Sequence, residues 1–341
     1  MNLTELNKVA EAMVAPGKGI LAADESTGTI KKRFDAIGIE NTEENRRNYR
    51  ELMFRTSEAM SKYISGVILY DETIWQKAKD GTPLVEIIKK SGAIPGIKVD
   101  EGTKPLPNCP GELITVGLDK LADRLAKYYE QGARFAKWRA VIDIGQGIPS
   151  HNAVHANAHA LARYAALCQA AQIVPIVEPE VLMDGDHDID RCYQVTEWVL
   201  KETFQELYYA GVALEGMVLK PNMAVPGKKS AKKASVQEVA EKTVKLLKNC
   251  VPGAVPGIAF LSGGQSDEEA TAHLDAMNKI GNLPWKLTFS YGRALQAAPQ
   301  KAWSGKSENV AAAQRAFTHR AMMNGLASLG QWKQDLEKKA A

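Results

Sequence analysis

The sequence has few cysteines, and no two of them form a paired motif. The four cysteines of the 341-residue chain are Cys109, Cys168, Cys192 and Cys250, which are far apart along the chain. Cysteine-based zinc sites and redox centres need cysteines at short spacings, so neither is indicated. Structural disulfides are not expected either, and we expect a chain that works in a reducing compartment.

Long apolar runs and a strong charge of one sign are also missing. No uninterrupted apolar run approaches the length of about 20 residues that spans a membrane. The first residues include Glu5 and Glu11 and form no apolar h-region, unlike a secretory signal or an acid-poor transit peptide. The formal net charge is only +3, which gives no strong case for nucleic acid or membrane as a partner. We expect a cytoplasmic protein with neither kind of partner.

Short apolar runs of strand type, by contrast, recur along the whole chain. There are eight of them, at residues 19–24, 66–71, 96–100, 136–144, 174–182, 216–220, 258–264 and 286–292. Amphipathic stretches long enough for helices lie between them, at residues 42–63, 118–132, 151–169, 188–209 and 235–249. Buried parallel strands joined by helices form an open doubly wound sheet or a closed barrel, and eight strands favour the barrel. No linker divides the chain, so we expect a single catalytic (β/α)8 TIM-barrel domain over residues 1–341.

The residues at the ends of these strands are unusually ionic. In a (β/α)8 barrel the chemistry collects at the C-terminal ends of the strands. Those positions hold Asp24, Asp71, Lys98, Lys137, Arg139, Glu178, Glu180, Lys220, Ser262 and Arg293. Residues two apart share a strand face, so the two cations of one strand should face the two carboxylates of the next. For any one of these residues alone, an ion-pair network that only fills the barrel mouth explains the pattern equally well.

Lys220 ends an apolar run and is followed at once by Pro221. A lysine at that point is costly to bury, which suggests an anionic partner or chemistry. Several lysines in one apolar cavity disfavour one another's charged forms and so lower a lysine pKa. A lysine with a pKa of about 10.4 is only about 0.04% neutral at pH 7, so a fall of two or three units raises the nucleophilic fraction roughly a hundredfold or more. We therefore predict that Lys220 is a reactive amine.

The segments after the last two strands resemble phosphate-binding loops. They read LSGGQS at 261–266 and SYGRAL at 290–295. Glycines let backbone N–H groups approach an oxyanion, while Ser262 adds a hydroxyl and Arg293 a fork of donors. In this architecture the loops after strands seven and eight commonly bind phosphate. A Gly-Gly turn taken alone is more often an ordinary loop.

Two other patterns resemble sites of a different function. LSGGQ also matches the signature of ATP-binding-cassette ATPases, but Gln300 stands where a Walker A loop before Lys306 needs glycine. His151, His155 and His159 lie on one side of a predicted helix and could bind zinc. That helix follows strand four and points away from the barrel mouth, so we favour an outer-helix role and predict no metal site.

The motifs together resemble class I fructose-bisphosphate aldolase, the Schiff-base glycolytic type. The segments that carry the resemblance are GKGILAADESTGTI, GIKVD, FAKWRAVI, PIVEPEVL, DGDHD, LEGMVLKPNMAVPG, FLSGGQSDEEA and LTFSYGRALQ, in order along the chain. The family implies metal-independent, reversible cleavage of fructose 1,6-bisphosphate to dihydroxyacetone phosphate and glyceraldehyde 3-phosphate. It implies no cofactor, a phosphorylated sugar as the partner, and a homotetramer.

The resemblance also implies roles for individual residues. Lys220 would form the imine, Glu178 would be the general acid and base, and Asp24 would accept the proton from the hydroxyl on carbon 4. Lys137 and Glu180 would complete the catalytic cluster. The substrate-binding residues would be Arg139, then Ser262, Gly263, Gly292 and Arg293 for one phosphate, and Ser26, Thr29, Arg33 and Lys98 for the other.

The sequence departs from relatives at two points and leaves two alternatives open. Animal members carry a tail that ends in tyrosine, whereas the last tyrosine here is Tyr291, and Asp143 replaces a lysine that is common late in strand four. One alternative is another Schiff-base barrel lyase of a phosphosugar, such as a transaldolase-like enzyme. The other is a scaffold role added to catalysis, for which the lysines of residues 228–233 would be the contact, although a solvated loop is the simpler expectation.

Overall fold

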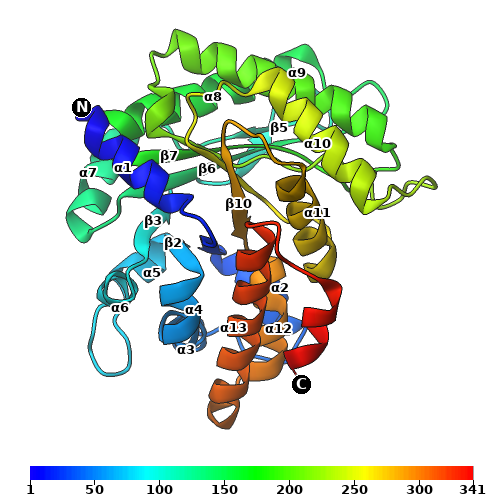
Figure 1. Ribbon diagram of the computed structural model, residues 1–341. Coiled ribbons are helices and arrows are strands. Elements are labelled where there is room, and N and C mark those ends of the chain that lie inside the picture. Colours follow the sequence, from blue (N-terminus) through cyan, green and yellow to red (C-terminus); the bar gives the residue numbers. More distant parts are fainter. Residues whose placement is uncertain (341) are drawn as a thin grey trace.

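The strands close into a parallel barrel surrounded by helices, as the sequence predicts (Figure 1). The computed structural model describes residues 1–340, and the side chains of residues 1–338. The barrel strands are β1 (Gly19–Ala23), β2 (Ile64–Leu69), β3 (Ile94–Lys98), β6 (Phe135–Ile142), β7 (Val174–Val181), β8 (Val218–Leu219), β9 (Gly257–Phe260) and β10 (Lys286–Tyr291). Each pairs in parallel with its neighbours, and β10 closes the ring against β1.

Helices follow most of the strands and form the outer layer. They are α1 (Leu3–Met13), α2 (Thr27–Asp35), α3 (Glu43–Phe54), α4 (Ser57–Lys62), α5 (Asp71–Trp75), α6 (Leu84–Lys90), α7 (Leu121–Gln131), α8 (His151–Ala170), α9 (Ile189–Tyr209), α10 (Val236–Cys250), α11 (Asp267–Ile280), α12 (Arg293–Trp303) and α13 (Val310–Ala327), with short 3-10 turns at Leu214–Gly216, Ser307–Asn309 and Gln334–Ala340. Among the described helices, none is long and apolar enough to cross a membrane.

Two details of the secondary structure differ from the sequence prediction. The helix expected over residues 42–63 is split into α3 and α4, because the backbone of Thr56 leaves the helical region and its hydroxyl donates to the Leu52 carbonyl at 2.9 Å. Strands β4 (Thr103–Pro105) and β5 (Leu113–Thr115) form an antiparallel hairpin after β3 that the sequence analysis did not predict. Both are short and exposed in part, so neither carries a clear hydrophobic period.

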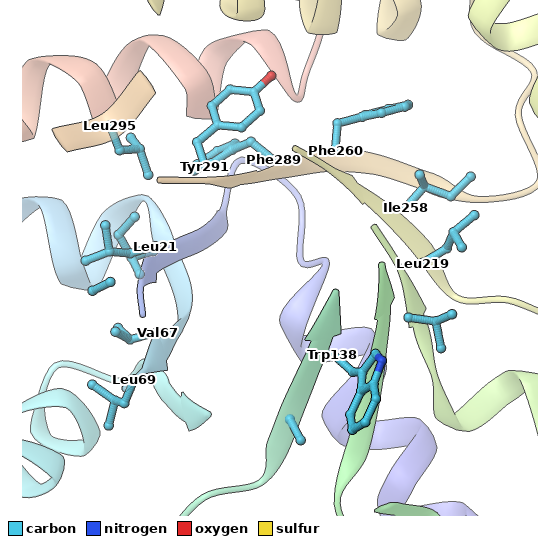
Figure 2. Close-up of a cluster of buried hydrophobic side chains, with 14 of the residues drawn as sticks. Leu21, Val67, Leu69, Trp138, Leu219, Ile258, Phe260, Phe289, Tyr291 and Leu295 are labelled. Atoms are coloured by element: carbon cyan, nitrogen blue, oxygen red, sulfur yellow. The ribbon is translucent and has the colours of Figure 1, made fainter. Parts of the chain in front are cut away.

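The core has two layers, one on each side of the barrel wall. Successive residues of each strand point alternately into one layer and the other. Leu21, Val67 and Leu219 point outward and pack under the helices in the cluster that Figure 2 shows. Their neighbours Ile20 and Ile68 belong to an inner cluster with side chains of α1, which covers one end of the barrel. This period of two is the one expected for a strand between a filled barrel and a helical shell.

The inner face changes from apolar to ionic along the strands. Residues two apart share a face, so Asp24 follows Ile20 and Ala22, Lys137 follows Phe135, and Lys220 follows Val218. The apolar members lie in the inner core, whereas the ionic members come two residues later on the same strand faces, toward the C-terminal ends of the strands. The barrel is therefore filled with apolar side chains at one end and presents charged groups at the other.

Candidate active site

A cavity of about 630 Å³ opens at the C-terminal ends of the strands. All fourteen site residues that the sequence analysis names contribute to its lining. The lining also contains eight Lys or Arg residues against six Asp or Glu residues, so cations are in excess. A polar cavity of this size with surplus positive charge suits a small anionic ligand.

Lys220 lies at the end of β8 and is only 4% exposed. Its backbone N–H donates to the Val177 carbonyl at 2.8 Å, which continues the pairing of β8 with β7. Pro221 has no N–H, so the buried turn that follows has one backbone donor fewer to satisfy. The Pro221 carbonyl accepts a hydrogen bond from Leu261 N at 3.2 Å. Burial lowers the pKa of Lys220, and nearby Lys137 lowers it further, although the carboxylates of Glu178 and Asp24 oppose the shift. The neutral amine is therefore more populated than in a free lysine.

Lys137 joins two carboxylates from neighbouring parts of the barrel. Its Nζ lies 2.7 Å from Asp24 Oδ2 and 3.4 Å from Glu178 Oε2. Burial alone would raise the pKa of Asp24, but the charges of Lys137 and Lys220 outweigh it and leave that pKa well below its usual range. Burial would likewise lower the pKa of Lys137, yet Asp24 and Glu178 raise it above its usual value. Lys137 is thus a fixed cation and Asp24 a fixed carboxylate.

Glu178 is shared by two lysines at the centre of the cavity. Its Oε1 lies 3.3 Å from Lys220 Nζ, and its Oε2 has no hydrogen-bond partner among the described residues. The side chain is almost wholly buried. In the described part of the chain Oε2 is therefore held only by the ion pair with Lys137 at 3.4 Å, and it can accept a hydrogen bond from a polar group of a ligand.

Arg139 and Glu180 form the predicted pair on β6 and β7. Arg139 Nε lies 2.5 Å from Glu180 Oε2. The register places Arg139 opposite Glu178, which is two residues before Glu180 on β7. Arg139 keeps 43% of its side chain exposed although its partner is buried, so it can contact a ligand at the cavity mouth.

One end of the cavity is built like an anion site. Gly292 precedes α12, so the N-terminus of that helix opens toward the cavity, and Arg293 is the first helical residue. Arg293 donates to the carbonyl of Gly263, which has a positive φ of 57°. Ser262 lies at the same place and is 5% exposed. A helix N-terminus with glycine backbone and an arginine attracts an oxyanion.

A second group of donors also lines the cavity. Ser26 is the N-cap of α2, and its hydroxyl accepts from Thr29 N at 3.4 Å. Arg33 lies on the same helix, while Lys98 comes from the end of β3. The arrangement again combines a helix N-terminus with hydroxyls and cations.

The supporting acids around this second group were missed from the sequence. Glu25 pairs with Arg33 and lies 3.9 Å from the fully buried Arg50, while Asp100 Oδ1 lies 2.9 Å from Lys98 Nζ. Glu25 comes one residue after Asp24, and Asp100 comes two residues after Lys98. Both acids are buried. Their nearness in sequence was a signal, but Arg50 comes from α3 and nothing in the sequence links it to Glu25.

Other residues singled out in the sequence lie elsewhere. Asp71 starts α5 and accepts from the Tyr128 hydroxyl at 2.7 Å, outside the cavity lining. The three histidines are on α8 in the outer layer, as predicted. In the lysine-rich loop, Lys228 lies 2.7 Å from Asp184 and does line the cavity, which the interpretation as a purely solvated loop did not foresee.

Comparison with known proteins gives one consistent family. The family model for "Fructose-bisphosphate aldolase class-I" matches residues 5–341. A probable fructose-bisphosphate aldolase class 1 of Xanthomonas campestris is 60% identical over 98% of this chain and 100% of its own length. The cytosolic fructose-bisphosphate aldolase 4 of Arabidopsis thaliana is 55% identical over 98% of this chain and 85% of its own. A fructose-bisphosphate aldolase of Plasmodium falciparum, solved with TRAP and a small-molecule inhibitor, superposes with a TM-score of 0.96 at 50% identity, covering 97% of this chain and 96% of the other.

Proposed function

Because the chain belongs to the class I fructose-bisphosphate aldolase family, we propose that Lys220 is the imine-forming nucleophile of its reaction. The chain is a glycolytic lyase of this class, which cleaves fructose 1,6-bisphosphate reversibly to dihydroxyacetone phosphate and glyceraldehyde 3-phosphate. The single observation that carries the proposal is a buried lysine whose pKa is lowered by its burial, 3.3 Å from the carboxylate of Glu178. A neutral amine beside a proton carrier is what imine formation requires.

In the first half of the reaction the neutral Nζ of Lys220 adds to carbon 2 of the open-chain ketose. The carbonyl oxygen becomes the hydroxyl of a carbinolamine, and the nitrogen gives up a proton. Glu178 then donates a proton to that hydroxyl, water leaves, and the protonated imine remains. The position of Glu178 supports this role, since its carboxylate lies 3.3 Å from Lys220 Nζ and its Oε2 makes no hydrogen bond among the described residues.

In the second half Asp24 accepts the proton from the hydroxyl on carbon 4. The bond between carbons 3 and 4 breaks, its electron pair moves toward the iminium nitrogen, and glyceraldehyde 3-phosphate leaves as the aldehyde. The remaining enamine is protonated at carbon 3 and hydrolysed to dihydroxyacetone phosphate and free Lys220. Lys137, at 2.7 Å, keeps Asp24 in the ionised form that can accept a proton, and Glu180 holds Arg139 in place.

The two phosphates anchor the ends of the sugar in our proposal. The phosphate on carbon 1 binds at Ser262, Gly263, Gly292 and Arg293, and the phosphate on carbon 6 at Ser26, Thr29, Arg33 and Lys98. Support comes from the helix N-termini of α12 and α2, which both border the cavity. Fixing both ends holds the scissile bond beside Asp24 and Lys220.

The substitution Asp24→Asn tests whether Asp24 acts only in the second half of the reaction. Imine formation should continue while cleavage slows by about 100-fold or more, which is the usual contribution of a general base. Borohydride added during turnover of fructose 1,6-bisphosphate should then trap an uncleaved six-carbon adduct on Lys220. Asp184→Asn is the matched control, because Asp184 lines the same cavity but is exposed and pairs with Lys228 rather than with the catalytic cluster. Wild-type cleavage by Asp24→Asn would refute the assignment.

Three further statements complete the proposal. We propose that residues 1–341 form one catalytic domain, that the chain assembles as a homotetramer, and that it works in the cytoplasm without cofactor or metal in the reaction. The tetramer rests on the family resemblance, and the exposed aromatic rings of Tyr208 and Tyr209 at the end of α9 are consistent with a buried contact. The cytoplasmic location is supported by the relative named cytosolic. Light scattering on the purified chain tests the assembly.

A further inference from the structure

A cluster of histidine and glutamate side chains lies between α8 and α9, outside the barrel. His155 and His159 are four residues apart on α8, and Glu202 and Glu206 are four residues apart on α9. Residues at this spacing point to the same side of a helix. The two helices pack side by side (Figure 1), so the two pairs face each other across their contact.

Three of the side chains converge on one point. His155 Nδ1 lies 2.8 Å from Glu202 Oε1 and 3.7 Å from Glu206 Oε1. One ligand atom from each of these three residues falls within 4.8 Å of the other two. In a tetrahedral zinc site with bonds of about 2.0 to 2.2 Å, neighbouring ligand atoms are about 3.4 Å apart. The distances of 2.8 and 3.7 Å lie on either side of that value, so small side-chain movements would bring the three ligand atoms to the spacing of a metal site.

A fourth residue fixes one of the ligands. His159 Nδ1 lies 2.8 Å from Oε2 of Glu206, the oxygen that does not face His155. Partners of this kind orient a ligating carboxylate and are typical of the shell around a bound metal. His159 thereby holds Glu206 with its other oxygen turned toward His155 and Glu202.

The charge balance of the cluster also favours a cation. Glu206 is 7% exposed, and in the part of the chain that the structure describes neither Glu202 nor Glu206 has a Lys or Arg within 4.0 Å. Their ion-pair partners are the two histidines, which are charged only when protonated. Two carboxylates at a helix contact, one of them buried, without a permanent cation are costly unless something positive binds there.

We propose that His155, Glu202 and Glu206 form a binding site for a divalent transition metal of the zinc type, with water completing the coordination. An imidazole nitrogen with two carboxylate oxygens suits such an ion, and an incompletely filled protein shell leaves room for water. None of the three residues lines the catalytic cavity, so the site is separate from the aldolase reaction. The metal fastens α8 to α9, the helices that follow the strands of Lys137 and Glu178.

The direct test is metal binding by the full-length chain without an affinity tag. After chelator treatment and dialysis, Zn²⁺ is titrated against a competing colorimetric chelator, and Co²⁺ is added separately to record the visible absorption of a tetrahedral site. We expect one equivalent of Zn²⁺ per chain and a Tm raised by a few degrees at saturating Zn²⁺, because the ion binds the folded state. Activity should be the same with and without EDTA.

Variants then assign the ligands. His155→Gln and Glu206→Gln should each weaken Zn²⁺ binding by at least tenfold and abolish the Co²⁺ spectrum, while His159→Gln should weaken it less, since it acts through Glu206. His151→Gln is the matched control: His151 is on the same helix, stacked 6.0 Å from the His155 ring, but outside the cluster. The proposal is overturned if no Zn²⁺ binds below 1 mM, if the ligand variants bind like the wild type, or if His151→Gln loses binding while His155→Gln retains it.

Discussion

Replacing Lys137 with methionine should destabilise the fold and inactivate the enzyme together. Lys137 is buried and joins Asp24 and Glu178 at 2.7 and 3.4 Å. Lys137→Met keeps the volume but removes the cation that lies between two buried carboxylates, which leaves Lys220 as their remaining shared lysine neighbour. Removing one partner of a buried ion pair costs about 3–5 kcal/mol. For 341 residues the entropy of unfolding is about 0.7 kcal/mol/K, so the Tm should fall by about 4–7 °C at pH 7.

The pH dependence of that loss gives the sharper test. The pKa of Asp24 is depressed in the folded protein, so its stabilising contribution is present above its unfolded value of 3.8 and is lost as the pH falls through the folded value. The pKa of Lys137 is raised, so its contribution is complete below its unfolded value of 10.5. Both are therefore in full effect at pH 7. In the variant the carboxylates of Asp24 and Glu178 have lost the charge of Lys137 and take up protons more readily, so the Tm difference should shrink as the pH is lowered toward 4.

Melting scans of both proteins at one scan rate between pH 4 and pH 8 measure this difference. Lys62→Met is the control, because its ion pair with Glu58 lies on the surface and should contribute nothing measurable. A Tm difference under 1 °C at pH 7, or one that stays constant down to pH 4, would show that solvent screens the Lys137 ion pairs and that the charged cluster is not the buried network described above.

Three further predictions concern the reaction itself. Glu178→Gln should lower kcat by about 100-fold or more and reduce the imine trapped at steady state, measured by borohydride reduction and mass spectrometry, because dehydration of the carbinolamine loses its proton donor. Arg293→Met should raise KM for fructose 1,6-bisphosphate at least tenfold in steady-state assays, and an unchanged KM would remove Arg293 from the phosphate site. The rate of reductive methylation of Lys220, followed by peptide mapping, should rise with pH around a midpoint below 10.5, since burial lowers its pKa; a midpoint at or above 10.5 would contradict the account.

The barrel and most of its charged lining could be predicted from the sequence because both depend on local alternation. In the strand that contains Val218 and Lys220, the apolar inner residue predicts the direction of the lysine two positions later. The same argument holds for Phe135 and Lys137. Few topologies are possible for a chain of eight such strands. Once the barrel is predicted, the residues at the strand ends are also predicted to line the cavity.

The parts that sequence analysis missed depend on contacts between distant segments. Arg50 on α3 reaches Glu25 after β1, and no local pattern links them. The histidine spacing on one helix raised a zinc site as an alternative, but Glu202 is 47 positions from His155, so the sequence did not reveal that two glutamates complete the cluster. The split between α3 and α4 depends on the backbone conformation of Thr56, which the hydrophobic periodicity of the sequence does not indicate.

The measurement that tests the central claim most directly is borohydride trapping with dihydroxyacetone phosphate in the presence of EDTA, followed by peptide mass spectrometry. We predict a single reduced adduct on Lys220 and none on Lys137, whose pKa is raised rather than lowered. Lys220→Met should give no adduct, because the thioether of methionine cannot form an imine. An adduct on another lysine, or full activity without any adduct, would contradict the assignment of Lys220 as the nucleophile.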